Sequence, residues 1–247
     1  FISDLIKPLY YKAGVRCFAM ETLKSQNNAL INKLVTSKEY DQQLALRLFR
    51  DVYWPFWGYK EYMDIVQAVW KLNHSLPTEA ERFKVVGLEQ DWDAYDRFFG
   101  SKSTPVVPRD EHMAKVVAKE VLEKNKKALV LIGFNHSFTH YKQPRLKDGK
   151  LVGEWPRFGY ILYEKYGDRL FQICLHKWQS KLTKSSELCT LVGFIETVLS
   201  LNGNQPVGFD IENSPFAHLR DRDNYYFAYQ KDVVFSDITQ GYIFFKR

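Results

Sequence analysis

Short apolar runs, separated by segments with helical spacing, most constrain how this chain folds. The clearest runs are VRCFAM, FKVVGL, ALVLIGF and LFQICL at residues 15–20, 83–88, 128–134 and 170–175. Continuous apolar runs of this length are typical of strands buried on both faces of a parallel sheet. Their alternation with helical patterns predicts an α/β fold with three layers, in which helices flank a central, mostly parallel sheet. We expect all four runs to lie in one sheet.

Further elements follow from periodicity and from residues that start or stop helices. Apolar spacing predicts a first helix over residues 2–12 that ends at Gly14, and Thr36 with Glu39 predicts a capping box for a helix reaching residue 52. Other helices are expected at 59–72, 109–125, 157–166 and 188–201, a turn at Asp148–Gly149, and strands at 207–211, 233–235 and 242–245. Residues 22–75 are interpreted as a helical insertion over one sheet edge. Because there is no repeat and no linker, residues 1–247 are expected to form a single domain.

Composition excludes several classes of protein. Of 247 residues, 45% are apolar and 26% charged, which excludes intrinsic disorder and collagen-like repeats. No apolar run approaches the ~18–20 residues of a transmembrane helix, so no transmembrane segment is expected. The net charge is +6, but the basic residues are mixed with acidic ones, and no zinc-finger or RNA-binding motif is present. Nucleic acid is therefore not an expected partner. The 16% aromatic residues indicate a bulky core or a cleft with aromatic walls.

Three cysteines, an odd and sparse number, do not form a disulfide framework. Cys17 and Cys174 lie in apolar runs and are expected to be buried thiols. One disulfide between two of the three cysteines can still form, so the cysteines do not decide between a reducing and an oxidising compartment. Since residue 1 is Phe rather than Met, we expect that the chain begins inside a longer precursor, whose upstream part would carry any signal for export or lipid anchoring.

Polar residues follow the predicted strands where ligands bind in open parallel sheets, beyond the carboxyl ends. They are Glu21, Glu89, Asn135 with His136, and His176. Two carboxylates and two imidazoles are therefore expected on one rim, with Glu21, Glu89 and His136 opening into one cleft. Convergence of this kind is the main functional signal in the sequence.

Each of these residues has a functional and a structural interpretation. Glu21 can act as a base, as the partner of a histidine or as a metal ligand, and otherwise is a solvated acid or helix cap. Glu89 is a supporting carboxylate or a surface acid. His136 is a general base or a metal ligand, or else a hydrogen-bonded structural histidine. His140 adds an imidazole four residues on, but without the glutamate of an HExxH motif a zinc-protease site is not indicated.

The motif Arg109-Asp110-Glu111-His112-Met113-Ala114, followed by ALVLIGFNH, resembles the erythromycin esterase-like proteins. The ending Gly133-x-x-His136 is also similar to the related ChaN-type haem-binding and Tiki proteins. Three further stretches follow in the same order as in those proteins: FAMET with Glu21, WGYKEYMDIVQAVWKLN before FKVVGLE, and FGYILYEKYGDRLFQICL. The resemblance therefore covers most of residues 9 to 180. One departure is the absence of a first strand ending in Gly-Glu-x-His, which we expect to lie upstream of Phe1.

The resemblance implies a central sheet with a deep cleft at the strand ends. In the erythromycin esterases that cleft hydrolyses a macrolide lactone without a metal, through a histidine base supported by glutamates. In the ChaN-type group the corresponding region binds haem, and the Tiki group is linked to metal-dependent proteolysis. Fold similarity does not choose among these chemistries. If the Gly-Glu-x-His strand is missing, Glu21 and His136 belong to an incomplete site, and residues 1–247 alone are expected to hydrolyse esters weakly or not at all.

The leading hypothesis is a hydrolase acting on an ester, lactone or amide of a small-molecule substrate. Glu21 orients the base and water, and His136 is the base or stabilises the oxyanion. Arg109 pairs with Glu21 or Glu89, holds an anionic substrate group, or only faces solvent at a helix start. Asn135, Glu89 and His140 complete the substrate-binding or supporting set. No cofactor is required for this chemistry.

The alternatives are a haem or divalent-metal carrier without catalysis, and a catalytically inactive scaffold. The sequence does not decide whether the protein is cytoplasmic, or exported or lipid-anchored, in a bacterium. It does not decide the oligomeric state either.

Overall fold

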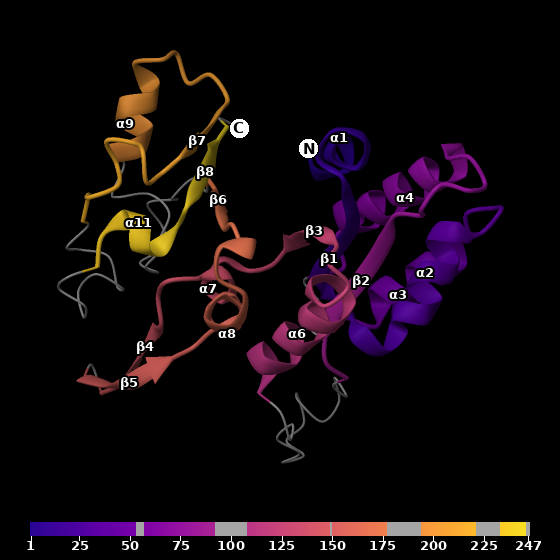
Figure 1. Ribbon diagram of the computed structural model, residues 1–247, viewed down its shortest axis with the longest axis horizontal. Coiled ribbons are helices and arrows are strands. Elements are labelled where there is room, and N and C mark those ends of the chain that lie inside the picture. Colours follow the sequence, from indigo (N-terminus) through magenta and orange to yellow (C-terminus); the bar gives the residue numbers. More distant parts are fainter. Residues whose placement is uncertain (53–56, 92–107, 149, 177–193, 221–232, 246–247) are drawn as a thin grey trace. The chain divides into compact units, whose positions relative to one another are not determined.

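The computed structural model describes residues 1–52, 57–91, 108–148, 150–176, 194–220 and 233–245 (Figure 1). The chain divides into two compact units, Phe1–Gly133 and Phe134–Arg247, and each is described by itself. The content is mixed α/β, with a small parallel sheet in the first unit and smaller sheets in the second. The three-layer arrangement and the single domain stay predictions. In the described part of the chain, no helix combines the length and the apolar character needed to cross a bilayer.

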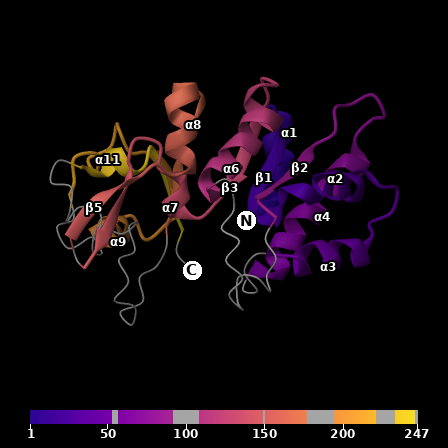
Figure 2. The ribbon, with the colours of Figure 1, turned by 90° about the horizontal axis from the view of Figure 1, so that it is seen from below.

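The first unit is built on a three-stranded parallel sheet. Its strands are β1 (Val15–Lys24), β2 (Lys84–Glu89) and β3 (Lys127–Leu131), in the order β2-β1-β3 (Figure 2). Phe18 of β1 lies between Val85 and Leu129, and β1 is buried along almost its whole length. Three of the four predicted strands are thus confirmed as neighbours, although β1 runs four residues beyond its predicted end, from residue 20 to residue 24.

Helices surround this sheet. They are α1 (Ile2–Ala13), α2 (Asn28–Thr36), α3 (Gln42–Arg50), α4 (Lys60–Ser75) and α6 (Arg109–Val117), which continues as a π-helix over Ala118–Leu122. Gly14 ends α1 with a φ of 68°, as predicted. The predicted capping box at Thr36 is wrong: Thr36 ends α2, and the carboxylate of Asp41 caps α3 by accepting the Leu44 N–H at 2.8 Å. The helices pack an apolar core on the sheet that includes Ile6, Phe18, Ile31, Val69 and Phe83.

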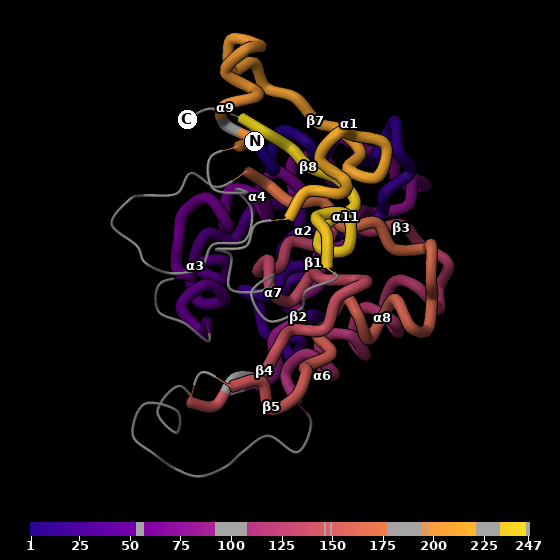
Figure 3. The backbone as a smooth tube through the Cα atoms, turned by 90° about the vertical axis from the view of Figure 1, so that its left-hand side faces the viewer, coloured from indigo at the N-terminus to yellow at the C-terminus, as the bar shows by residue number. Residues whose placement is uncertain are grey.

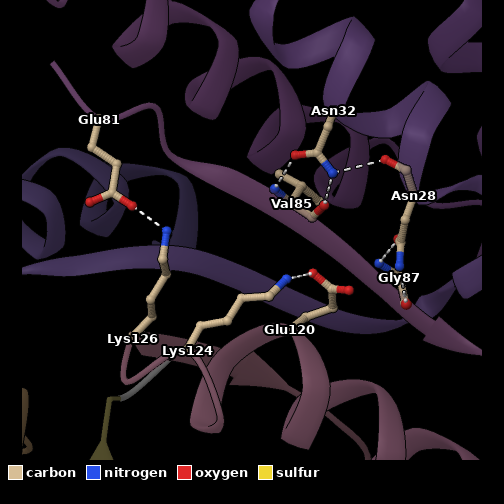
Figure 4. A network of polar contacts seen from close by, with 8 residues as sticks. All are labelled: Asn28, Asn32, Glu81, Val85, Gly87, Glu120, Lys124 and Lys126. Atoms are coloured by element: carbon tan, nitrogen blue, oxygen red, sulfur yellow. Dashed lines mark hydrogen bonds and ion pairs between the residues drawn. The ribbon is translucent and has the colours of Figure 1, made fainter. Parts of the chain in front are cut away.

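Asparagine side chains satisfy the outer edge of β2. Asn28 accepts the Gly87 N–H at 2.7 Å and donates to the Gly87 carbonyl at 3.3 Å, while Asn32 does the same for Val85 at 3.3 and 2.9 Å (Figure 4). Asn73 of α4 repeats the pattern on Phe83, at 2.8 and 2.9 Å. The amides replace the hydrogen bonds that a fourth strand would make. The edge is therefore closed to pairing with another chain.

We expect Asn32→Ala to lower the free energy of unfolding by about 1–3 kcal/mol, because it leaves the Val85 N–H and C=O unsatisfied on a covered edge. Chemical denaturation monitored by circular dichroism measures this loss. Asn202→Ala, at an exposed turn position in the second unit, is the control and should change stability little. Equal stability of Asn32→Ala and the parent chain would show that water reaches this edge.

The second unit holds a hairpin and a second small sheet (Figure 3). The hairpin pairs β4 (Gln143–Lys147) with β5 (Lys150–Trp155), and the sheet has the order β6-β8-β7. The strands of this sheet are β6 (Ile173–Leu175), β7 (Val207–Asp210) and β8 (Gly241–Phe244). The described helices of the second unit are α7 (Phe134–Ser137), α8 (Phe158–Tyr166), α9 (Phe194–Ser200) and α11 (Phe235–Ile238). Phe138, Tyr141, Ile195, Phe235 and Tyr242 lie in its core.

Two strand predictions fail here. The run at 170–175 does not join the sheet of β1, because β6 pairs in parallel with β8, where the Gly241 N–H donates to the Gln172 carbonyl at 2.9 Å. Residues 233–235 are not a strand. Phe235 and Ile238, three residues apart, are both buried in α11, whose start is held by Asp237 accepting the Val234 N–H at 2.8 Å.

The turn between β4 and β5 places Asp148 at φ 51°, as the predicted Asp148–Gly149 turn requires; Gly149 lies outside the described residues. Residues 188–193 of the helix predicted at 188–201 also lie outside the described residues, and α9 covers the remainder as far as Ser200. Cys17 and Cys174 are buried, as predicted, whereas Cys189 is not among the described residues. Burial raises the pKa of the Cys17 thiol to about 12, so this thiol stays protonated.

Candidate functional site

A bulge in β1 positions the first candidate residue. Met20 lies opposite Gly87 of β2, but Lys24 lies opposite Glu89, so β1 passes two more residues than β2 over the same distance. The extra backbone at Leu23 and Lys24 crowds Gly87, where an added Cβ would lie 2.6–2.8 Å from backbone atoms. Glycine is required there by this close approach. Bulges of this kind re-aim side chains next to functional sites, and here the bulged segment carries Glu21.

Glu21, Glu89 and Arg109 form one buried ion cluster. Arg109, the first residue of α6, donates from Nη2 to Glu21 Oε2 at 3.0 Å and to Glu89 Oε2 at 2.6 Å, and from Nε to Glu89 Oε2 at 2.7 Å. Glu21 Oε1 also accepts the Gly133 N–H at 2.6 Å. Glu21 and Glu89 come from two adjacent strands and meet at the carboxyl edge of the sheet. Arg109 was expected to pair with Glu21 or with Glu89, and it pairs with both glutamates at once.

The cluster carries two carboxylates and one guanidinium, so its formal charge is −1 when both acids are ionised. Burial raises the pKa of Glu89, whose side chain is fully buried, although the hydrogen bonds and charge of Arg109 oppose that shift. Burial disfavours the charged form of Arg109, but the bonds and charges of the two glutamates outweigh it and raise the guanidinium pKa. The pKa values of both groups are thus raised, that of Glu89 by burial and that of Arg109 by the two glutamates.

Two other side chains lie near this cluster, and Thr22 is the residue that follows Glu21 in sequence. The Trp57 ring lies 5.6 Å from the Arg109 guanidinium. The pKa of Tyr62 is raised by burial and then by the charge of Glu21. Thr22, which follows Glu21 in the bulge, is 4% exposed, and its Oγ1 has no hydrogen-bond partner among the described residues. A buried hydroxyl without a partner is costly.

A second layer of polar contacts continues from the end of β1. Lys24, buried in the strand, contacts Asp51 at 2.5 Å and Asp91 at 3.6 Å. Ser25 Oγ lies 2.9 Å from His112 Nε2, one helical turn after Arg109, and burial lowers the pKa of His112. These residues were not predicted from the sequence. The only local signal was a lysine and a serine directly after an apolar run, since their partners are 27 to 87 residues away.

The remaining predicted site residues lie in the second unit. Asn135 and His136 are in α7, exposed and half-buried respectively. His140 packs its ring 4.1 Å from that of Tyr163 and contacts Thr139 Oγ1 at 2.9 Å. His176 contacts the Tyr242 hydroxyl at 2.6 Å, and burial lowers its pKa. The shared cleft of His136 with Glu21 and Glu89 stays a prediction.

Within the described ranges, no three His, Cys, Asp or Glu side chains are grouped as ligands for a metal ion. Both cluster carboxylates are engaged by Arg109, so the described residues do not fit a resident metal held by three protein ligands. Two hollows of about 220 and 260 Å³, on the helices around α4, contain none of the cluster residues.

Comparisons of the chain with models of protein families, with curated proteins and with solved structures found no match.

Proposed function

We propose that this chain hydrolyses a carboxylic ester, lactone or amide at the cluster of Glu21, Glu89 and Arg109. One observation carries the proposal: two carboxylates and an arginine are buried together at the carboxyl edge of parallel strands, on a bulge. Ligands of open α/β sheets bind at this edge. The similarity of the Arg109–Ala114 motif to erythromycin esterase-like proteins supports the same chemistry.

Glu21 is the reacting carboxylate in this proposal. Its side chain is 11% exposed, whereas that of Glu89 is fully buried, so only Glu21 is open to water. The Gly133 N–H and Arg109 fix its two oxygens, which orients the carboxylate toward an attacking water. Glu89 is a positioning residue, because it acts through Arg109.

The water oxygen attacks the carbonyl carbon while its proton passes to the base, and the carbon–oxygen or carbon–nitrogen bond then breaks. The leaving group takes a proton back from the base, which restores the site. Glu21 is the base in this step, and the role of base that the sequence predicts for His136 stays a separate prediction.

The test is an assay of the chain against a panel of esters, lactones and amides. We expect slow hydrolysis of at least one class and a loss of about 10²–10⁴-fold on Glu21→Gln, the usual effect of removing a base or its orienting group. Glu79→Gln, at an exposed position in the turn between α4 and β2, is the matched control and should retain full activity.

His136→Ala in the same assay decides between the two bases. Loss of activity assigns the base to His136, and full activity assigns it to Glu21. Activity that survives Glu21→Gln would contradict the proposal. A Soret band that forms with added haem in the absence of any hydrolysis would instead favour the haem-carrier alternative.

A further inference from the structure

The β4–β5 hairpin presents exposed cationic and apolar side chains together. Within the second unit it forms a separate two-stranded sheet, visible as a ribbon of two antiparallel strands in Figures 1 and 2. A register shift between Arg145 and Leu146 leaves Val152 as an extra residue in β5. Gly153, next to this extra residue, has a φ of 154°, a backbone conformation that residues with a side chain rarely adopt.

One face of the hairpin is basic. Lys147 lies directly opposite Lys150, and Arg145 lies opposite Gly153, so the three cations share a face with Trp155. The guanidinium groups of Arg145 and Arg157 lie 5.1 and 4.8 Å from the Trp155 ring. Like charges placed opposite each other destabilise a strand pair. The Lys147–Lys150 pair therefore favours a partner that brings negative charge.

The same hairpin exposes apolar surface. Leu151, Val152 and Trp155 are 45%, 58% and 49% exposed. Residues 142–157 carry five Lys or Arg against two Asp or Glu. Aliphatic side chains, an amphipathic tryptophan and cations in one small element are the combination found where proteins enter the boundary between lipid headgroups and acyl chains.

We propose that the β4–β5 hairpin binds the surface of a bilayer that contains anionic lipids. Lys147 and Lys150, beside the turn, contact the headgroups. Leu151, which lies opposite Leu146 on the other face of the hairpin, and the extra residue Val152 enter the boundary region, while Arg145 and Trp155 lie farther along the basic face. A nucleic acid offers nothing that would bury Leu151 and Val152. The hairpin is also much smaller than the roughly 20–30 residues a side of a stable protein–protein interface, whereas a membrane engages a small element through each basic residue separately.

The test is sedimentation of the full chain with two kinds of vesicle. One is phosphatidylcholine alone and the other contains about one third phosphatidylglycerol, which supplies the negative surface potential. We expect binding to the anionic vesicles only, weakened by high salt. Lys147→Gln with Lys150→Gln should weaken binding about 25-fold, and Leu151→Ser with Val152→Ser at least about fivefold.

Lys12→Gln with Lys33→Gln removes the same charge from exposed sites in α1 and α2 of the first unit and is the matched control. Retained binding by this control, with loss in both hairpin variants, supports the proposal. Equal loss in the control and the hairpin variants would assign binding to net charge, and equal binding to both vesicle types or to neither would also overturn it. Binding of a single-stranded oligonucleotide in place of vesicles would assign the basic face to nucleic acid. Circular dichroism of each variant confirms that the chain remains folded.

Discussion

Arg109→Met is expected to lower the free energy of unfolding by about 3–5 kcal/mol at pH 7, because it leaves two buried carboxylates without their cation. Glu89 is fully buried and Glu21 nearly so, and both bond the same Arg109 nitrogen. Arg50→Met, at an exposed position in the last turn of α3, is the control and should cost less than about 0.5 kcal/mol. Denaturant unfolding of the parent and of both variants measures the difference.

The loss should shrink in acid. The pKa of Glu89 is raised above its ordinary value of 4.5, mainly by burial, so the folded state holds this proton more tightly than the unfolded chain. Stability that comes from the neutral carboxyl is fully present below pH 4.5 and is lost as pH rises through the raised pKa. Adding Glu89→Gln to Arg109→Met should likewise recover part of the stability. A loss that is independent of pH and is not recovered by Glu89→Gln would show that Arg109 acts by packing alone.

Gly87→Ala is expected to cost about 1–3 kcal/mol or more, as overpacking does when the obstructing atoms are backbone. The new Cβ would lie 2.6 Å from the Leu23 carbonyl oxygen and 2.7 Å from that of Lys24. The bulge must then move, and Glu21 moves with it. Hydrolysis should fall together with stability, as measured by denaturation and by the ester assay.

Gly208→Ala is the control for Gly87→Ala, since its Cβ would meet only ordinary contacts, the nearest at 3.6 Å. It should leave hydrolysis intact. A Gly87→Ala protein with parental stability would contradict the close approach of β1 and β2 at the bulge.

The elements that the sequence predicted are those with a local signature. Apolar runs identified β1, β2 and β3, and Gly14 marked the end of α1. Polar residues at strand ends indicated Glu21 and Glu89, and a helix start in front of β3 indicated Arg109. These features depend on periodicity and on residue type within a few positions.

The missed features depend on partners far along the chain. The bulge arises from contact between Leu23 and Gly87, and the closed edge of β2 from asparagines 10 to 59 residues away from the backbone that they bond. β6 pairs with β8, 68 residues later, rather than with the sheet of β1. An apolar run predicts a strand, but nothing within the run states which strand will be its neighbour.

The most direct test of the Glu21–Glu89–Arg109 cluster as a functional site compares activity and stability in one protein, Glu21→Gln. Glutamine keeps the volume of Glu21, and its amide oxygen can still accept the Gly133 N–H, but its NH2 group cannot accept from Arg109 Nη2 as Glu21 Oε2 does. We therefore expect the free energy of unfolding to fall by about 1–3 kcal/mol, and kcat/KM for ester hydrolysis to fall at least about 100-fold. A large loss of stability with unchanged kcat/KM would contradict this account and assign the cluster to holding β1, β2 and α6 together.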